Sequence, residues 1–207
     1  MVRAGDLISS ISYGFDAAHL YLRYDLRQPF TELAATAPFT VAAYLAGPGA
    51  QAKRDFSRCG RTEPRTLLGL GANYELSVSL HPDEVGLSLV TVGADGKWSA
   101  PLELPKGAAV GVSGSVVEVA LPFAALGEVD SGTALLLRSV VSQKKNDLQL
   151  VPANGPAKLV APDLGLTTTI LEVDDPGGDD FEPGAYTYPT DGVFGGGAYD
   201  LVVQRGL

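Results

Sequence analysis

The chain has 207 residues, of which 45% are hydrophobic, and its mean hydropathy is +0.14. This apolar content suffices to bury the core of one large domain, or of one domain with an appendage. No apolar run approaches the roughly 18 residues that a membrane helix needs. The formal net charge of −9 has the wrong sign for binding a phosphate backbone, so nucleic acid is excluded as an expected partner.

No secretory signal precedes the first strand-like segment, which begins almost directly after Met1. We interpret this abrupt start as a boundary inside a longer, exported protein. The single cysteine, Cys59, excludes a disulfide within the chain, so bridges give no information on its redox compartment.

Alternation of apolar and polar residues with a period of two predicts strands along most of the chain. The runs at 7–13 and 19–26 flank a Gly-Phe-Asp corner and predict a hairpin, and the apolar run at 39–46 predicts a central strand. The segment from Gly47 to Gly71 carries five cationic residues. It predicts a long loop or insertion, in which one short helical turn is also compatible with the sequence.

Further strands are expected at 74–80, 86–92, 102–104, 116–121, 135–141 and 148–151. Asp95-Gly96 predicts a hairpin turn, because Asp-Gly supplies the positive φ that a type I′ turn requires. Pro122 to Gly127 predicts one helical turn. Many short strands with turn signals between them predict an all-β fold, an antiparallel β-sandwich of jelly-roll-like kind, over residues 1–163.

The sequence indicates no catalytic machinery. His19 and His81 have no ligand-like spacing to another metal-binding residue, and there is no nucleophile elbow or phosphate-binding loop. A glycosidase needs two carboxylates that face each other across a sugar cleft. Glu103 and Glu118 instead lie in predicted strands beside apolar neighbours, where an outward-facing carboxylate is expected. We therefore predict that the chain is not an enzyme.

The C-terminal segment, 164–207, is acidic and rich in Gly, Pro and Tyr. Residues 165–207 carry a net charge of −7, which leaves −2 for the rest of the chain. Calcium takes six to eight oxygen ligands, many of them from loop carboxylates. We predict a calcium site here, and a solvated acidic loop remains the alternative. The predicted ligands are Asp174, Asp175, Asp179, Asp180 and Glu182.

Aromatic side chains are the second unusual feature of this segment. Their faces can stack on sugar rings, and Tyr adds a hydroxyl to an apolar face. Packing inside the protein explains the same residues equally well, so both interpretations stay open. The predicted sugar-binding residues are Trp98, which follows the Asp95-Gly96 turn, with Tyr186, Tyr188 and Tyr199.

The acidic segment contains a distinctive series of motifs. They are Asp175-Pro176-Gly177-Gly178-Asp179-Asp180, Pro183-Gly184-Ala185-Tyr186-Thr187-Tyr188-Pro189-Thr190, Phe194, and Gly197-Ala198-Tyr199-Asp200-Leu201. Through these motifs the segment resembles a known family, the glucodextranase C-terminal module. One departure is Glu182-Pro183-Gly184, where the family usually has Gly-Pro-Gly. Similar modules follow the catalytic part of amylopullulanases and related α-amylases, and they belong to the DOMON-like β-sandwiches.

The resemblance implies a non-catalytic, carbohydrate-binding accessory module of an exported α-glucan-degrading enzyme. Its partners would be a polysaccharide and an upstream catalytic domain, and its location extracellular or on the cell surface. The alternative is a structural or cell-surface-anchoring module without sugar affinity. In the family the signature opens a module, so residues 164–207 are expected either to complete this sandwich or to begin the next.

Overall fold

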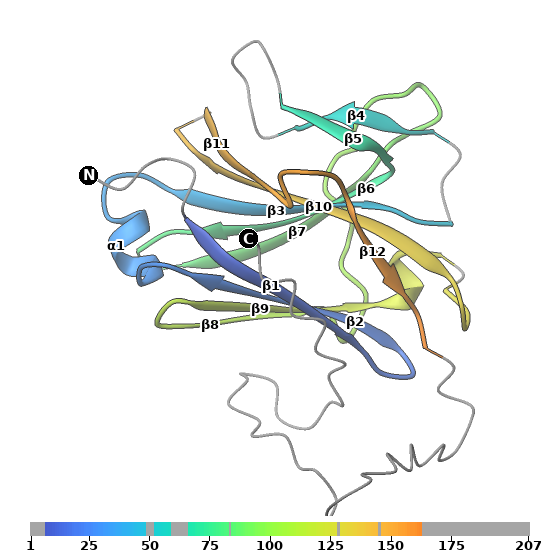
Figure 1. Ribbon diagram of the computed structural model, residues 1–207, viewed down its shortest axis with the longest axis horizontal. Helices are drawn as coiled ribbons and strands as arrows, with labels where there is room; N and C mark the ends of the chain where they lie inside the picture. Colours follow the sequence, from blue (N-terminus) through green and yellow to red (C-terminus); the bar gives the residue numbers. More distant parts are fainter. Residues whose placement is uncertain are drawn as a thin grey trace, which may run out of the picture.

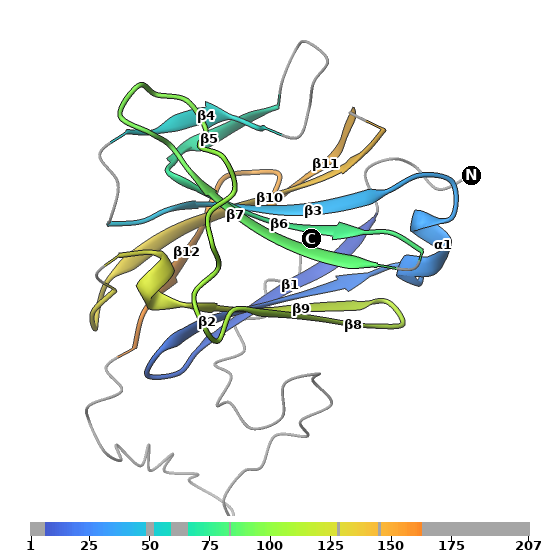
Figure 2. The ribbon, with the colours of Figure 1, turned by 180° about the vertical axis from the view of Figure 1, so that it is seen from behind.

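The computed structural model shows an antiparallel β-sandwich and describes residues 7–48, 52–58, 66–82, 84–127, 129–144 and 146–162. The predicted sugar-binding tyrosines and the predicted calcium ligands lie outside these ranges, as does Cys59. Figures 1 and 2 show two facing sheets, with a short two-stranded ribbon beyond one of them. The all-β sandwich predicted from the sequence is confirmed.

The elements follow the chain with two short helical turns among twelve strands of the described ranges. They are β1 (Ile8–Phe15), β2 (His19–Leu26), α1 (Phe30–Ala34), β3 (Phe39–Ala46), β4 (Arg54–Phe56), β5 (Leu67–Ala72), β6 (Tyr74–Leu80), β7 (Val85–Thr91), β8 (Ala109–Ser113), β9 (Val116–Pro122), the 3-10 turn η1 (Phe123–Ala125), β10 (Ala134–Gln143), β11 (Asn146–Val151) and β12 (Ala157–Val160).

The four-stranded sheet has the order β1-β2-β9-β8, and all its pairs are antiparallel. The sequence of β2 explains why this sheet forms. Burial alternates strictly along the strand, because the apolar side chains lie on one face and the polar ones on the other. The predicted hairpin of β1 and β2 is present. Asp16 closes it, since its carboxylate accepts the backbone N–H groups of Ala18 and His19, both at 2.7 Å.

The six-stranded sheet has the order β11-β10-β3-β6-β7, and β12 also pairs with β10. β11 binds the C-terminal half of β10 and β12 its N-terminal half, so the two short strands share one edge of β10. The central strand β3 is buried on both faces over most of its length, as its apolar sequence predicted. One face meets the other sheet and the other face meets the ribbon.

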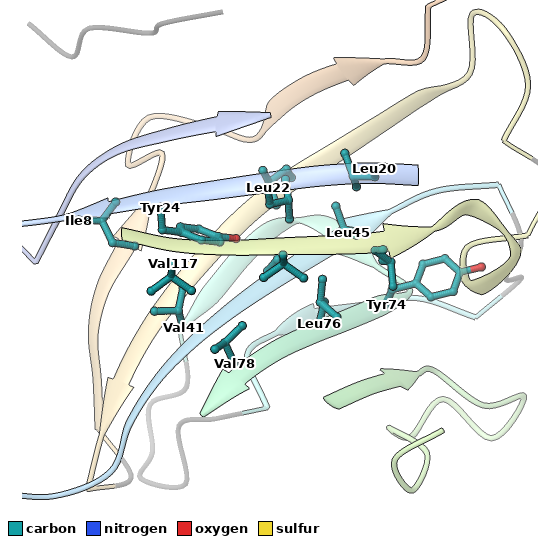
Figure 3. Packing of buried hydrophobic residues seen from close by; sticks show 14 of the residues in the cluster. Ile8, Leu20, Leu22, Tyr24, Val41, Leu45, Tyr74, Leu76, Val78 and Val117 are labelled. Carbon is teal, nitrogen blue, oxygen red and sulfur yellow. The ribbon is translucent and has the colours of Figure 1, made fainter. Parts of the chain in front are cut away.

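The main core lies between the two sheets. Leu20, Leu22 and Val117 from the four-stranded sheet face Val41 and Leu76 from the six-stranded sheet, as Figure 3 shows. Tyr24 brings a hydroxyl group into this layer. Its hydroxyl lies 3.0 Å from the Ser139 Oγ, and burial raises the pKa of Tyr24 to about 12, so the phenol stays neutral.

One side chain joins the two sheets at their edges. The Gln149 Oε1 on β11 accepts the N–H groups of Leu7 and Ile8, at 3.0 and 2.8 Å, at the start of β1. Its amide nitrogen lies 3.4 Å from the Ile8 carbonyl oxygen. The side chain thus supplies the backbone of β1 with partners that a neighbouring strand would otherwise provide.

The structure differs from the predicted long loop at 47–71. Its described parts contain the antiparallel ribbon β4–β5, which lies over the outer face of the six-stranded sheet (Figure 1). Leu68 and Ala72 point inward and are buried against Ala42, Tyr44 and Val140. β5 could not be predicted from the sequence, because Gly69 and Gly71, both with positive φ, interrupt its alternation of apolar and polar residues.

Two smaller expectations also need correction. The segment 102–104 forms no strand, although Leu102 N–H donates to the Leu89 carbonyl. β12 was not expected, because a four-residue strand is too short to show a period. A turn at Asp95-Gly96 is confirmed, with Gly96 at a φ of 73° and the Gly93 N–H bound to the Lys97 carbonyl. It is not the predicted type I′ turn, because Asp95 lacks the positive φ that this type requires.

Candidate functional site

Trp98 is the predicted sugar-binding residue that the structure describes. It follows the 93–97 turn, forms a bridge with Val92, and packs against the small cluster beneath the ribbon. Its ring centroid is 5.9 Å from that of Tyr44, with an angle of 59° between the rings. Core packing therefore accounts for its position. The side chain remains partly exposed, and its role in stacking on a sugar stays a proposal.

Beside this aromatic pair lies a buried carboxylate that the sequence analysis did not single out. Glu75 on β6 has no exposed surface, and the Arg58 Nε lies 3.0 and 3.1 Å from its two carboxylate oxygens. Burial raises the pKa of Glu75, and hydrogen bonds and charge from Arg58, with bonds from Tyr44 and Ser77, oppose this shift. The Arg58 N–H also donates to the Tyr44 hydroxyl, at 2.8 Å.

Some buried polar atoms on the six-stranded sheet and the turn after it lack a hydrogen-bond partner. Within the described ranges, the Trp98 Nε1, the Ser88 Oγ and the Arg138 Nε are buried without a hydrogen-bond partner. Arg138 is 8% exposed, and its other two nitrogens donate to the carbonyls of Leu68 and Ala153, both at 2.7 Å. Its role is structural, because it ties β10 to the ribbon and to the turn before β12.

The outer face of the four-stranded sheet carries a second polar group of side chains. His19, Tyr21, Arg23 and Asp25 alternate with buried leucines and Tyr24 along β2, and all four are partly exposed. The register with β9 places Glu118 directly opposite Arg23. The alternation in β2 was visible in the sequence, but the pairing of Arg23 with Glu118 required the order of the strands.

Electrostatic pairing organises this outer face. The Arg23 Nε and Nη2 lie 3.1 and 3.0 Å from the Asp25 Oδ1, and its Nη1 is 3.5 Å from the Glu118 Oε1. Glu118 lies on the outer face of its strand, as the sequence predicted, but neighbouring side chains leave it only 3% exposed. Glu103, by contrast, is exposed in the connection before β8. A buried, ion-paired glutamate on a strand and an exposed glutamate in a connection do not resemble the carboxylate pair of a glycosidase.

The described part of the chain shows neither a metal-binding cluster nor a membrane-spanning helix. Within residues 7–162, leaving out the gaps given above, no three His, Cys, Asp or Glu side chains come close enough to hold a metal ion. His19 binds Asp16, its Nδ1 lying 3.1 Å from Oδ1, and His81 opens the β6–β7 turn. No helix in these ranges is long and apolar enough to cross a bilayer.

Comparison with known proteins bears on the C-terminal segment. Residues 170–205 match the family model described as the C-terminal binding-module, SLH-like, of glucodextranase. Neither a curated protein nor a solved structure matches the chain. The match covers the segment in which the acidic residues and tyrosines gave the resemblance from the sequence. At residues 170–205 the chain is thus similar to the glucodextranase C-terminal binding module.

Proposed function

We propose that the chain is a non-catalytic, carbohydrate-binding accessory module of an exported α-glucan-degrading enzyme, such as an amylopullulanase or a related α-amylase. The observation that carries this proposal is the match of residues 170–205 to a binding-module family of glucodextranase. That family implies an extracellular or cell-surface setting. The antiparallel sandwich supports the proposal, because its rigid sheets can present side chains to an extended ligand.

Affinity electrophoresis in gels that contain amylose, pullulan or dextran tests the proposal directly. We expect at least one of the three polysaccharides to slow the chain relative to a protein of similar size and charge. The same preparation should release no reducing sugar from any of them. If none of the gels slows the chain, it does not bind these α-glucans, and the proposed function fails.

Tyr186, Tyr188 and Tyr199 are the proposed stacking residues in the matched segment, together with Trp98. Tyr186→Ala should reduce the retardation, because the substitution removes an aromatic face. Retardation that persists unchanged in this variant counts against the tyrosine platform, while the polysaccharide-binding function itself would stand.

A second candidate function is attachment to the cell surface, and the term SLH-like in the family's description favours it. In that case the partner is the cell envelope or another protein domain. Sedimentation with purified cell-wall material separates the two functions. A chain that sediments with cell wall but migrates normally in all three polysaccharide gels is an anchor without α-glucan affinity.

A further inference from the structure

β1 forms one edge of the four-stranded sheet, because β2 is its only partner among the described strands (Figure 1). Just beyond the end of β1, the Asp16 N–H donates to the His19 carbonyl at 3.1 Å. Backbone groups alternate in direction along an antiparallel strand, so the even-numbered residues of β1 from position 10 onward bond to β2. The N–H and C=O groups of Ile11, Tyr13 and Phe15 therefore face away from β2, along the free edge.

These outward groups have no partner in the part of the chain that the structure describes. Gln149 bonds to the N–H groups of Leu7 and Ile8, which come before them in the strand. An edge of this kind is a template on which a further strand can add.

The core is incompletely covered along the same edge. Ile11 and Tyr13 point into the sandwich, since they lie opposite buried residues of β2, yet both stay partly exposed. On the facing sheet, at the edge that Gln149 joins to β1, Val151 and Ala157 pack against the core and are also partly exposed. A strand added to β1 would remove apolar surface from water here as well as bond the backbone groups.

The chain leaves β12 at the end of the sandwich where β1 also ends. Val160, the last residue of β12, pairs with Ala134, the first residue of β10. The turn η1 before β10 packs at the same end, because the ring of Phe123 lies 6.0 Å from that of Phe15. Figures 1 and 2 agree that the end of β12, η1 and the β1–β2 turn lie together. A strand that turned back from there along β1 would run antiparallel to it.

The sequence after β12 contains a run that favours a strand. Residues 166–173 read Leu-Thr-Thr-Thr-Ile-Leu-Glu-Val, and five of these eight residues are β-branched. Pro162 and Gly165 precede the run and suit a turn. Facing sheets lie about 10 Å apart and four residues can span about 13 Å, so the connection at 162–165 is long enough.

β12, on the same side of the sandwich, offers a poorer edge for this run. The Ala161 N–H donates to the Thr133 carbonyl at 2.9 Å, so alternate residues of β12 bond to β10. Within the strand this leaves the outward groups of Lys158 and Val160, and a proline flanks the strand on either side. β1 offers a longer stretch of outward groups.

We propose that residues 166–173 add to the free edge of β1 as an antiparallel strand, so that the four-stranded sheet gains a fifth strand from the C-terminal segment. The family match begins at residue 170, within this run, so the matched segment is attached to this sandwich and does not open a separate module. This attachment does not require sugar binding, so it is tested independently of the proposed function.

Amide hydrogen exchange of the full chain, followed by NMR, tests the proposal residue by residue. The amides of Ile11, Tyr13 and Phe15 should be protected, although the described strands leave them unbonded. Those of Ser12 and Gly14, which bond to β2, are the internal reference. If the first three exchange at the rate of a free peptide while the reference stays protected, the edge is free and the proposal is wrong.

Proline substitutions identify the segment that supplies the protection. Alternate residues of an added strand bond to β1, so one of Ile170→Pro and Leu171→Pro removes such a bond. At least one of these variants should accelerate exchange of the three edge amides by about tenfold or more, with the reference amides unchanged. Val193→Pro, which places the same residue outside the run, should leave the edge protected.

Protection that survives both proline variants overturns the assignment. If it then falls on dilution, a second copy of the chain occupies the edge, and if it does not, another part of the chain does. Should the proline variants fail to fold in a thermal melt, nuclear Overhauser contacts in the monomeric wild type decide. Contacts between residues 166–173 and β1 support the proposal, and their absence overturns it.

Discussion

A glutamate without solvent contact holds the layer beneath the ribbon together. Glu75 is fully buried, whereas the side chain of its partner, Arg58, is 38% exposed. An ion pair with one partner in water recovers only part of the cost of removing the other partner from water. This imbalance agrees with the direction of the shift, because burial outweighs Arg58 and raises the pKa of Glu75.

The pH dependence of stability follows from this direction. A raised pKa means that the folded chain binds the Glu75 proton more tightly than the unfolded chain does. Binding of this proton therefore stabilises the fold below pH 4.5, the ordinary pKa of a glutamate, and this stabilisation is lost as the pH rises. Glu75→Gln cannot titrate. Its melting temperature should therefore gain on that of the wild type as the pH rises above 4.5, where the wild type loses this stabilisation.

Thermal melts of both proteins across this pH range provide the measurement. Glu84→Gln, which removes an exposed carboxylate from the β6–β7 turn, controls for the loss of one negative charge. A difference between Glu75→Gln and the wild type that shrinks as pH rises would show that Arg58 outweighs the effect of burial.

At the scale of elements, the ribbon depends on a few polar contacts with the sheet below. Asp147 on β11 accepts the Ser142 Oγ at 2.8 Å and also the hydroxyl of Ser57, the residue after β4. Asp55 accepts the N–H groups of Leu70 and Gly71 within the ribbon, at 3.0 and 3.2 Å. A short strand pair with so few apolar anchors should open more readily than the sandwich.

Asp147→Ala tests this arrangement. The variant leaves two buried hydroxyls, those of Ser57 and Ser142, without their acceptor, which should cost about 1–3 kcal/mol of unfolding free energy. Hydrogen exchange should accelerate more at the Ser57 amide, which bonds to the Thr66 carbonyl, than at amides of β3. Asp147→Asn keeps an acceptor and should show a smaller effect. Equal acceleration in ribbon and sheet would mean that the ribbon does not open by itself.

Some of these elements could be predicted from the sequence and others could not. Strict alternation in β2 and the Asp95-Gly96 turn predicted structure well, because each depends on residues close in the chain. The ribbon could not be predicted in this way. β5 owes its conformation to contacts with Ala42 and Val140, which lie on distant strands, and its glycines erase the alternation.

The same difference between contacts close in the chain and contacts between distant strands applies to the candidate sites. Trp98 was identified from its residue type. Its packing on Tyr44, however, depends on how the segment after β7 lies against β3. Arg23 and Glu118 are far apart in sequence and become neighbours only through the pairing of β2 with β9. The acidic segment was recognisable because its pattern is local, and the family match covers that segment.

For the whole molecule, charge is divided unevenly between the body and the acidic segment. We propose that the segment binds calcium through Asp174, Asp175, Asp179, Asp180 and Glu182, because crowded carboxylates repel one another without a cation. A cation bound only by the folded state stabilises that state by about 2.7 kcal/mol at a hundredfold excess over Kd. The melting temperature should rise with millimolar calcium, fall with chelator, and respond less to magnesium.

Variants of the same segment provide the control for this prediction. Asp179→Ala or Asp180→Ala should remove most of the calcium response and leave the sandwich folded. Asp95→Ala removes an exposed aspartate from the 93–97 turn and should keep the response. Identical melts of the wild type in calcium and in chelator would mean that the carboxylates are simply hydrated.

The bridge that Gln149 makes to β1 has a consequence for how copies of the molecule meet. An edge strand with unused N–H and C=O groups is a template on which another chain can add a strand, the first step of edge-to-edge aggregation. At the start of β1, the groups that such a strand would need are already bound by Gln149, which cannot extend into a further strand. The contact that joins the two sheets therefore also blocks the start of this edge to a further strand.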